Sequence, residues 1–415
     1  MSEWRKSYLC QLAEIIKGDQ VNSDTLDQTG KYPVINGGIE PSGYLDRWNR
    51  ERESITISEG GNSCGYVSLM KQRFWSGGHC YTLKNVQISN SYLYHYLKFI
   101  QQDIMKLRVG SGLPNIQRND IDEIEVYYPL DDQEQIRIAI ILSTVDEVIE
   151  KTEAAIDKYQ AIKAGMMQDL FTRGIDTQTG KLRPTIEEAP ELYKESKLGW
   201  IPKEWDVTDF DDVIKEYFDF RGKTPLKLGM NWGGGSIKAI SANNIEPGFI
   251  NFNKEHYLAS EDLYRAWMNH GDCSKGDVVM TSEAPLGVVA QIPDNNKYIL
   301  SQRVFLFKVK PSSITNDYLY YLMNTDRFQN DLQRQSSGST VTGIQQARLA
   351  RIRMQLTRSL EEQLHISKIL KSIDLGISDN KEMLSKYKNL KHGLMADLLT
   401  GKVRVNLNDN KVEKG

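Results

Sequence analysis

The sequence has few of the features that mark exported, membrane or disulfide-stabilised proteins. Its 415 residues include four cysteines, Cys10, Cys64, Cys80 and Cys273, and none of them forms a CxxC pair, so a disulfide framework is not expected. No window of about 18 residues is free of charged side chains, and no apolar stretch follows the N-terminal residues. We therefore expect a cytoplasmic protein that does not contact a membrane.

Nucleotide-binding and catalytic motifs are also missing. Residues 222–224, Gly-Lys-Thr, resemble the end of a P-loop, but Tyr217 replaces the glycine required five positions earlier and Pro225 stands where a helix should begin. The sequence has no Gly-x-Ser-x-Gly or His-Glu-x-x-His motif and no Asn/Asp-Pro-Pro-aromatic tetrad of an adenine methyltransferase. We expect a non-catalytic chain with no cofactor or metal of its own.

Charge is nearly balanced over the whole chain but uneven along it. The formal net charge is −3, so nothing attracts polyanions globally. Residues 297–358 contain ten Lys and Arg against three Asp, whereas residues 206–219 contain six acidic residues against Lys215 alone. A chain of this kind can still hold phosphate along one face.

The clearest feature is an internal repeat. Glu134-Gln135 recurs as Glu362-Gln363, and the register then holds without a gap as far as Thr172 and Thr400, with 15 of 39 positions identical. The same offset matches residues 110–111 with 338–339 and residues 116–117 with 344–345. Because chance poorly explains such a match, we interpret the chain as a duplicated unit in which a variable globule precedes a shared helix.

The shared segment is predicted to be a long helix. Residues 131–172 contain no proline, and apolar residues recur at alternating spacings of four and three, which is typical of a coiled-coil seam. Each helix would be about 60 Å long, and two matching seams favour pairing with each other over packing on separate globules. Thr152 and Asn380 occupy the same slot, where a polar residue can fix register. The predicted seam residues are Ile141, Val145, Val148, Thr152, Tyr159, Ile162, Ile369, Ile373, Asn380, Met383, Tyr387 and Leu390.

The remaining sequence carries short strand-like runs, such as residues 54–57 and 304–307, between Gly, Asn and Pro turns. We predict an α+β protein with two pseudo-symmetric α/β domains separated by a pair of long antiparallel coiled-coil helices. The shortest connection at the end of the first helix favours the antiparallel direction, although a fully extended linker could span the length of the helix. The predicted bounds are 1–130 for the first domain, 131–173 for the first helix, 174–204 for a linker, 205–357 for the second domain, 358–401 for the second helix and 402–415 for a tail.

This organisation resembles the specificity subunit of type I restriction-modification systems over essentially the whole chain. The similar motifs are Leu-Gly-Trp-Ile-Pro-Lys-Glu-Trp at 198–205, Arg-Gly-Lys-Thr-Pro at 221–225, the run at 57–67 and Phe-Trp-Ser-Gly-Gly-His at 74–79. The resemblance implies two target-recognition domains, each reading one half of a bipartite site in double-stranded DNA. It also implies two methyltransferase subunits that bring AdoMet, and translocating restriction subunits that use ATP.

Polar loop residues are the candidates for DNA contact. Arg and Lys can pair with guanine, Asn and Gln with adenine, while Ser and Thr can hold phosphate. In the first domain they are Asn36, Ser58, Asn62, Ser63, Lys71, Arg73, His79, Arg108, Ser111 and Gln117. In the second domain they are Arg221, Lys223, Thr224, Lys238, Asn243, Asn244, Arg303, Ser339, Thr340, Gln345 and Arg348. Two alternatives stay open at this point, a scaffold that binds protein rather than DNA and a specificity protein of another defence system.

Overall fold

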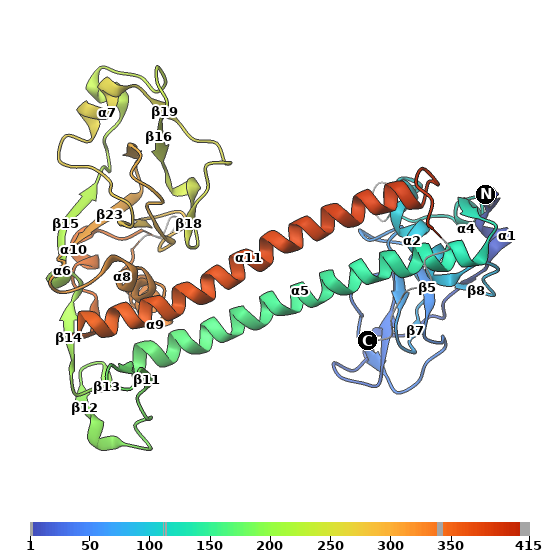
Figure 1. Cartoon of the computed structure of the whole chain (residues 1–415), viewed down its shortest axis with the longest axis horizontal. Helices are drawn as coiled ribbons and strands as arrows, with labels where there is room; N and C mark the ends of the chain where they lie inside the picture. The colour runs from blue at the N-terminus through green and yellow to red at the C-terminus, as the bar shows by residue number, and fades with distance from the viewer. Residues whose placement is uncertain (1–2, 111, 113, 338–342, 407–415) are drawn as a thin grey trace. The chain divides into compact units, whose positions relative to one another are not determined.

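The computed structural model describes residues 3–110, 112, 114–337 and 343–406 (Figure 1). The chain divides into two compact units. Unit 1 consists of Met1–Ala155 and Asn380–Gly415, and unit 2 of Ile156–Asp379. Two long helices, α5 (Asp132–Thr172) and α11 (Leu360–Leu398), each begin in one unit and end in the other. The predicted pair of long helices and the mixed α/β character of both halves are confirmed.

Unit 1 is built on a sheet with the strand order β2-β8-β5-β6. Its strands are β2 (Glu14–Lys17), β8 (Cys80–Lys84), β5 (Ser54–Ser58) and β6 (Val67–Met70). A second sheet has the order β4-β3-β7, and β1 pairs with β9. These strands are β3 (Tyr32–Ile35), β4 (Tyr44–Leu45), β7 (Trp75–Ser76), β1 (Trp4–Tyr8) and β9 (Glu125–Pro129). The short helices are α1 (Leu9–Leu12), α2 (Asn90–Phe99), α3 (Gln101–Lys106) and α4 (Arg118–Asp122), with a 3-10 turn η1 (Ser23–Thr25).

Unit 2 repeats this plan strand for strand. Its main sheet has the order β15-β23-β20-β21, its second sheet the order β19-β16-β22, and β14 pairs with β24. These strands are β15 (Ile214–Asp219), β23 (Val304–Val309), β20 (Val278–Thr281), β21 (Val289–Gln291), β19 (Leu258–Ala259), β16 (Ile237–Ile240), β22 (Tyr298–Leu300), β14 (Trp205–Asp209) and β24 (Arg353–Thr357). In both units the second sheet contains one parallel pair, β3 with β7 and β16 with β22. The duplication read from the sequence therefore extends to the topology.

The other elements of unit 2 are helices and short hairpins. The helices are α6 (Phe210–Val213), α7 (Glu261–Trp267), α8 (Asn316–Met323), α9 (Asp326–Gln335) and α10 (Gln346–Leu349), with 3-10 turns η2 (Pro190–Leu192), η3 (Pro225–Leu228) and η4 (Ala242–Asn244). The hairpins pair β10 (Ile175–Asp176) with β11 (Lys181–Leu182), β12 (Tyr193–Ser196) with β13 (Gly199–Pro202), and β17 (Ile245–Glu246) with β18 (Phe249–Ile250).

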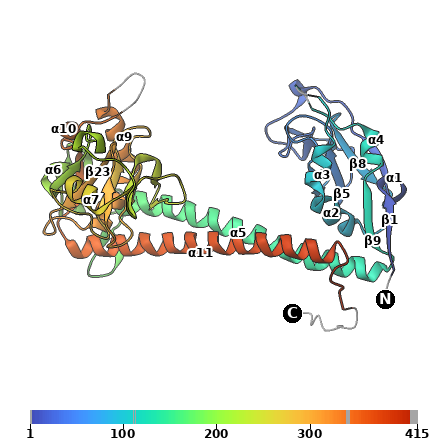
Figure 2. The ribbon, with the colours of Figure 1, turned by 90° about the horizontal axis from the view of Figure 1, so that it is seen from above.

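The central strands are largely buried on both faces because each main sheet is covered on both sides. All four residues of β20 are buried, as the run Val-Val-Met-Thr requires of a strand between two layers. In unit 1, α2 lies against the sheet that contains β5 and β8 (Figure 2). Met395 and Leu398 of α11 complete the same core, so the end of the second long helix is part of the first unit.

The repeated glutamines hold each long helix to its own unit. Gln135 accepts a hydrogen bond from the backbone N–H of Ser89, which caps α2, and Gln363 accepts one from the backbone N–H of Thr315, which caps α8. Both glutamines are at most 1% exposed. Because buried polar groups need partners, these two identities in the repeat have a structural explanation.

The glutamates beside them are buried as well, and each is neutralised by an arginine. In unit 2, the Glu362 carboxylate is 1% exposed and accepts hydrogen bonds from the Arg183 guanidinium, the Trp205 Nε1–H, the Ile175 N–H and the Thr357 hydroxyl. In unit 1, both oxygens of Glu134 accept hydrogen bonds from Arg404, at 2.6 Å each. The first arginine follows α5 and the second follows α11.

The prediction of a linker over 174–204 is therefore wrong. This segment folds into two hairpins within unit 2, and Ile175 and Ile201 are each 1% exposed in its core. The Pro and Gly residues that suggested a linker instead form turns. Gly174, for example, has a φ of +65° and lies so close to Glu362 and Trp205 that a Cβ there would clash.

The helix pair is antiparallel within each unit, as predicted. In unit 1, Asp146 and Glu153 of α5 pair with Lys391 and Lys388 of α11. In unit 2, Lys163 of α5 lies 2.6 Å from Asp374 of α11, and Gly376 faces the ring of Tyr159. Asp146 is equivalent to Asp374 in the repeat and Lys163 to Lys391, so the same ion pair occurs once in each unit with the two helices exchanged.

The predicted seam needs correction at alternate positions. Val145 and Thr152 lie on it, but the residues buried between and beyond them are Ile149 and Ile156, at 9% and 7% exposure. The side chains of Ile162, Met383 and Leu390 are instead 41–51% exposed, whereas Tyr159, which faces Gly376, lies on the observed seam. The predicted seam and the observed seam have every second residue in common, so periodicity alone could not distinguish them. Thr152 donates its hydroxyl hydrogen bond to the Val148 carbonyl of its own helix.

We predict that Arg183→Met destabilises unit 2 by about 3–5 kcal/mol, because it leaves the Glu362 carboxylate buried without a counter-ion. The measurement is urea-induced unfolding followed by circular dichroism. The double variant Arg183→Met/Glu362→Gln should recover part of this loss, since it removes the buried charge. Arg334→Met, at an exposed arginine of the same unit, is the control and should change stability by less than about 0.5 kcal/mol. Equal effects of the two arginine variants would contradict the role given to the buried pair.

Candidate nucleic-acid interface

In unit 1, several loops meet at one end of the strands. We call this set the loop edge of unit 1, and it consists of residues 18–20, 36–38, 59–63, 77–79 and 114–117. Backbone hydrogen bonds join these loops, including Glu59 N–H to the His79 carbonyl and Gly61 N–H to the Pro114 carbonyl. The structure thus brings together Asn36, Asn62, Ser63, His79 and Gln117 of the predicted DNA-binding residues, with exposed Arg108 beside Val109, which pairs with Asn115.

Unit 2 has the same loop edge, formed by residues 220–224, 241–244, 282–286, 301–303 and 343–345. Its backbone bonds are equivalent, with Ser282 N–H donating to the Arg303 carbonyl and Ile344 N–H to the Ser282 carbonyl. Arg303 therefore takes the place that His79 has in unit 1. The loop edge collects Arg221, Lys223, Thr224, Asn243, Arg303 and Gln345 from the predicted set, and α10 with Arg348 follows it directly.

A hollow of about 670 Å³ opens at the loop edge of unit 2. Four of the predicted residues line it, together with aromatic and basic side chains that the sequence analysis did not single out. Its lining includes Lys223, Thr224, Asn243, Arg303, Trp232, Lys254, Tyr257, Trp267 and Gln302. A concave site with aromatic walls and a few polar groups is suited to binding a planar ligand.

The cations of this hollow are held by neighbouring groups. Arg303 Nε lies 2.8 Å from Glu283 Oε1, and Lys254 Nζ lies 3.0 Å from Glu246 Oε1. Lys223 donates to the Trp267 carbonyl at 2.7 Å, and burial lowers the pKa of its ammonium group. Thr224 caps η3 by accepting from the Lys227 N–H, so the Gly-Lys-Thr sequence forms a turn and not a phosphate loop.

The loop edge of unit 1 has a different electrostatic centre. The side chain of Glu59 is 13% exposed and lies 2.6 Å from Lys17 Nζ and 3.5 Å from His79 Nδ1. It also accepts a hydrogen bond of 2.9 Å from the Tyr81 hydroxyl. Burial, followed by this bond and the charge of Glu59, raises the pKa of Tyr81. Carboxylates can accept from the cytosine amino group, so Glu59 is a residue that the sequence analysis missed.

Four of the predicted residues lie where their side chains do not face outward from a loop edge. Ser58 and Asn244 are 5% and 0% exposed, because their side chains hold loops together. Lys71 and Arg73 follow β6 at the opposite end of the sheet, where they pair with Glu150 and Glu51. A polar residue in a loop can equally serve the loop itself, as Ser58 and Asn244 do, and DNA contact by these four residues stays a prediction.

The other predicted residues have mixed placements. Arg221 contacts Asp219 and donates to the Ile344 carbonyl at 3.0 Å, while exposed Arg348 donates to the Gln335 carbonyl. Lys238 lies on β16 with its Nζ 4.6 Å from the centre of the Phe252 ring. Ser111, Ser339 and Thr340 lie outside the described residues.

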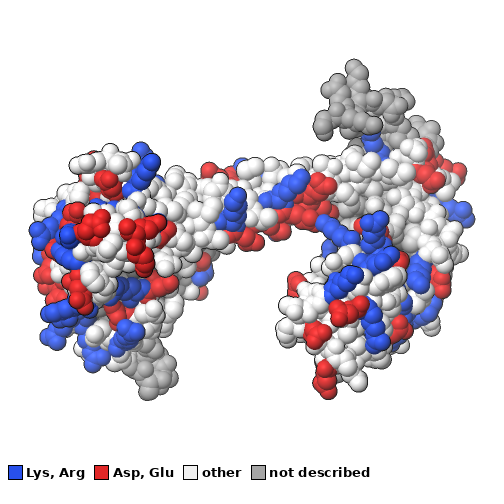
Figure 3. Space-filling view, turned by 90° about the horizontal axis from the view of Figure 1, so that it is seen from below, with Lys and Arg blue, Asp and Glu red and all other residues white. Residues whose placement is uncertain are grey.

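Strand pairing neutralises part of the uneven charge along the chain. Arg353 and Arg358, from the basic stretch, lie beside Asp209 and Asp206 from the acidic stretch, because β24 is antiparallel to β14. On the face shown in Figure 3, Lys and Arg side chains lie among Asp and Glu in both units. Local readout by loops is therefore more consistent with this surface than a broad basic track.

The described residues contain no helix suited to crossing a bilayer and no group of three or more His, Cys, Asp and Glu side chains arranged to hold a metal. The strand orders and loops described above define a duplicated α/β fold in which each unit presents a polar loop edge. Comparison with known proteins identifies its family.

The family model described as "Type I restriction modification DNA specificity domain" matches residues 1–158 and, a second time, residues 202–386. The chain belongs to this family. It is 28% identical over 397 residues to the type I restriction enzyme MjaVIII specificity subunit of Methanocaldococcus jannaschii, a match that covers 91% of this chain and 88% of the relative.

A second relative is the type I restriction enzyme EcoDI specificity subunit of Escherichia coli, at 22% identity over 221 residues, which covers 51% of this chain and 49% of the relative. The solved S subunit of a type I restriction-modification system from M. genitalium has a similar fold. It aligns with a TM-score of 0.67 at 20% sequence identity and covers 96% of both chains.

Asn243 and Asn244 test whether burial separates structural loop residues from DNA-contacting ones. They are adjacent in sequence, but Asn244 is buried and Asn243 is exposed. Asn244 accepts from the Ser241 hydroxyl at 2.6 Å and donates to the carbonyls of Asn251 and Glu255. We predict that Asn244→Ala lowers stability by about 1–3 kcal/mol, because it leaves buried polar groups unpaired. Asn243→Ala should change stability by less than about 0.5 kcal/mol and alter DNA recognition instead. Chemical unfolding and DNA titration of both variants check this, and equal stability losses would argue against it.

Proposed function

We propose that this chain provides the DNA sequence specificity of a cytoplasmic type I restriction-modification complex and that each unit reads one half of a bipartite site. The observation that carries the proposal is that one strand plan occurs twice and presents the same loop edge with different side chains. Two copies of one strand plan suit a duplex, whose two backbones are themselves related by a two-fold. Because the side chains differ, the two half-sites should differ in sequence.

The loop edges have the chemistry of base and phosphate recognition. Asn243 and Gln302 can pair with the edge of a base, and Arg303 can bind guanine or phosphate, while His79 and Glu59 offer a donor and an acceptor in unit 1. The net charge of −3 argues for weak binding by the isolated chain. Stronger, salt-dependent binding is expected once partner subunits surround the duplex.

Equivalent positions of the two long helices support the docking of two copies of one partner. Ile136 and its repeat equivalent Leu364 are 42% and 56% exposed, and Ile162 and its equivalent Leu390 are 41% and 51% exposed. An apolar side chain exposed at the same place in both copies indicates a surface that a partner covers. We assign this surface to two methyltransferase subunits, which would bring AdoMet and carry out methylation. Restriction subunits using ATP would join them, so this chain itself would not be catalytic.

Domain exchange tests the proposal. Replacing residues 205–357 by the equivalent segment of a relative should alter one half of the methylated motif and leave the other unchanged. The exchange keeps β14 and β24 together, so their pairing moves as a whole. The matched control replaces residues 1–130 and should alter the other half. The measurement is methylome sequencing of cells that carry each variant with its methyltransferase. A change in both halves of the motif after a single exchange would exclude one reader per unit.

A further inference from the structure

The hollow of unit 2 depends on a loop that unit 1 does not share. Residues 241–257 connect β16 to β19, whereas residues 36–43 make the equivalent connection between β3 and β4. The longer loop contains η4 and the β17–β18 hairpin, and Asn243, Lys254 and Tyr257 from it line the hollow. The hollow is therefore an addition to the strand plan that both units have.

Three packed aromatic rings, from buried Trp267 to exposed Tyr257, form one wall of the hollow. Trp267 is 1% exposed and donates its Nε1–H to the Leu300 carbonyl at 2.9 Å. Trp232 packs against it with ring centres 5.5 Å apart, and Tyr257 stacks on Trp232 at 5.1 Å with only 10° between the ring planes. Tyr257 remains 57% exposed. Since Trp232 covers one face of its ring, the exposed area lies on the other face and the edge.

An anchored aromatic ring with one open face is a stacking platform for a nucleobase. Base stacking is tolerant of sequence, but it requires a base whose own faces are free. The bases inside a duplex stack on each other, so their faces are closed to Tyr257. Only a base that is unpaired or removed from the stack can use this platform.

Basic and polar groups surround the platform. The side chains of Lys254 and Arg303 are 45% and 55% exposed, and their ion pairs with Glu246 and Glu283 each use only part of their hydrogen-bonding capacity. Arg303 and Ala284, both on the rim, have φ values of +67° and +47°, a conformation that side-chain-bearing residues seldom adopt and that occurs often at functional sites. Asn243 and Gln302 add groups that can meet the edge of a base.

We propose that the hollow of unit 2 binds an unpaired nucleobase of DNA, stacked on Tyr257, with its phosphate near Lys254 and Arg303. The inference rests on the proposed function, since a methyltransferase acting on a base in a duplex must take that base out of the stack and leave its partner unpaired. The hollow would hold a base that is left unpaired when the methyltransferase opens the DNA duplex.

The test uses the full-length chain and one labelled 12-mer, first single-stranded and then annealed to its complement, with affinity measured by fluorescence anisotropy. Wild-type protein is expected to bind the single strand. Tyr257→Ala should weaken that binding by about 5- to 100-fold and change duplex binding by less than about twofold. Tyr257→Phe keeps the ring and should retain the affinity.

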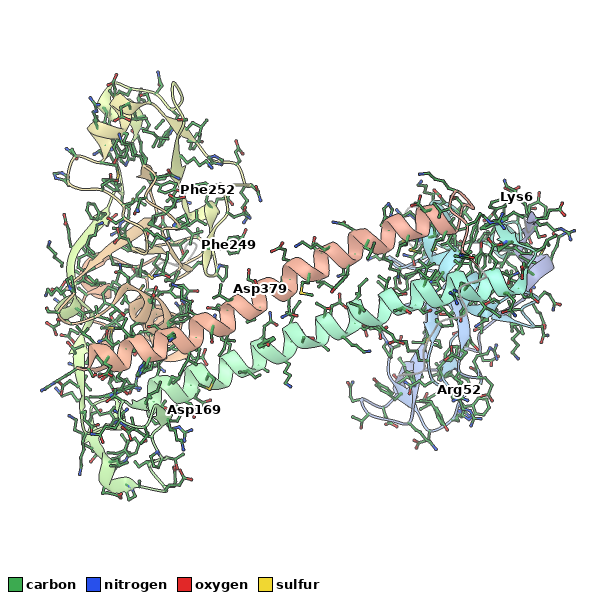
Figure 4. All side chains as sticks on the ribbon, in the orientation of Figure 1. Lys6, Arg52, Asp169, Phe249, Phe252 and Asp379 are labelled. Carbon is green, nitrogen blue, oxygen red and sulfur yellow. The ribbon has the colours of Figure 1, made fainter. Side chains whose placement is uncertain are left out.

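Phe249 is the matched control, because it belongs to the same unit, lies on the added hairpin and is 52% exposed (Figure 4). Phe249→Ala should leave single-strand affinity unchanged. Tyr257→Leu, which still covers Trp232 with apolar atoms, should lose affinity as the alanine variant does and guards against a folding artefact. No single-strand binding by the wild type, no effect of Tyr257→Ala, or equal losses on both DNA forms would overturn the inference. None of these results would alter the half-site assignment tested by domain exchange.

Discussion

A buried carboxylate at the start of each long helix is the constraint on which the two units depend. Glu134 and Glu362 are at most 2% exposed, and each is paired with an arginine that follows the end of the other long helix, Arg404 in unit 1 and Arg183 in unit 2. An unpaired buried carboxylate costs several kcal/mol. Neither unit is therefore complete until the chain has passed along a helix from the other one. The two halves keep their sequence identity at the start of the long helices, where this requirement acts, and differ more in the loops.

This arrangement separates a constant frame from two variable readers. Most identities of the repeat lie in the helices, where several of them serve buried hydrogen bonds and reciprocal ion pairs. The loop edges follow equivalent strand ends in both units, but their side chains differ in charge and aromatic content. Unit 1 has Glu59 bonded to Lys17 and Tyr81, while unit 2 has Arg303 beside an aromatic hollow. A protein that reads two unlike half-sites needs this combination of a shared frame and independent loops.

The sequence predicts the frame well because helix periodicity and an internal repeat are local or directly visible signals. It fails where several residues could satisfy the same pattern, as with Val148 and Ile149 on the helix seam. It also does not separate a polar residue that serves its own loop, as Ser58 and Asn244 do, from one that faces a ligand. Trp232 and Tyr257 are 25 positions apart in sequence, and only the path of the added loop brings their rings together. No local pattern could have indicated that stack.

The central prediction is that the length of the two long helices sets the spacing between the two half-sites. Removing one heptad from each helix, residues 152–158 and 380–386, keeps the 4-3 spacing and both the Asp146–Lys391 and Lys163–Asp374 pairs. Each helix shortens by about 10 Å. At about 3.4 Å per base pair, methylome sequencing should then show both half-sites unchanged and the spacer between them shorter by roughly three base pairs. A soluble, assembled variant that methylates at the original spacing would contradict the account.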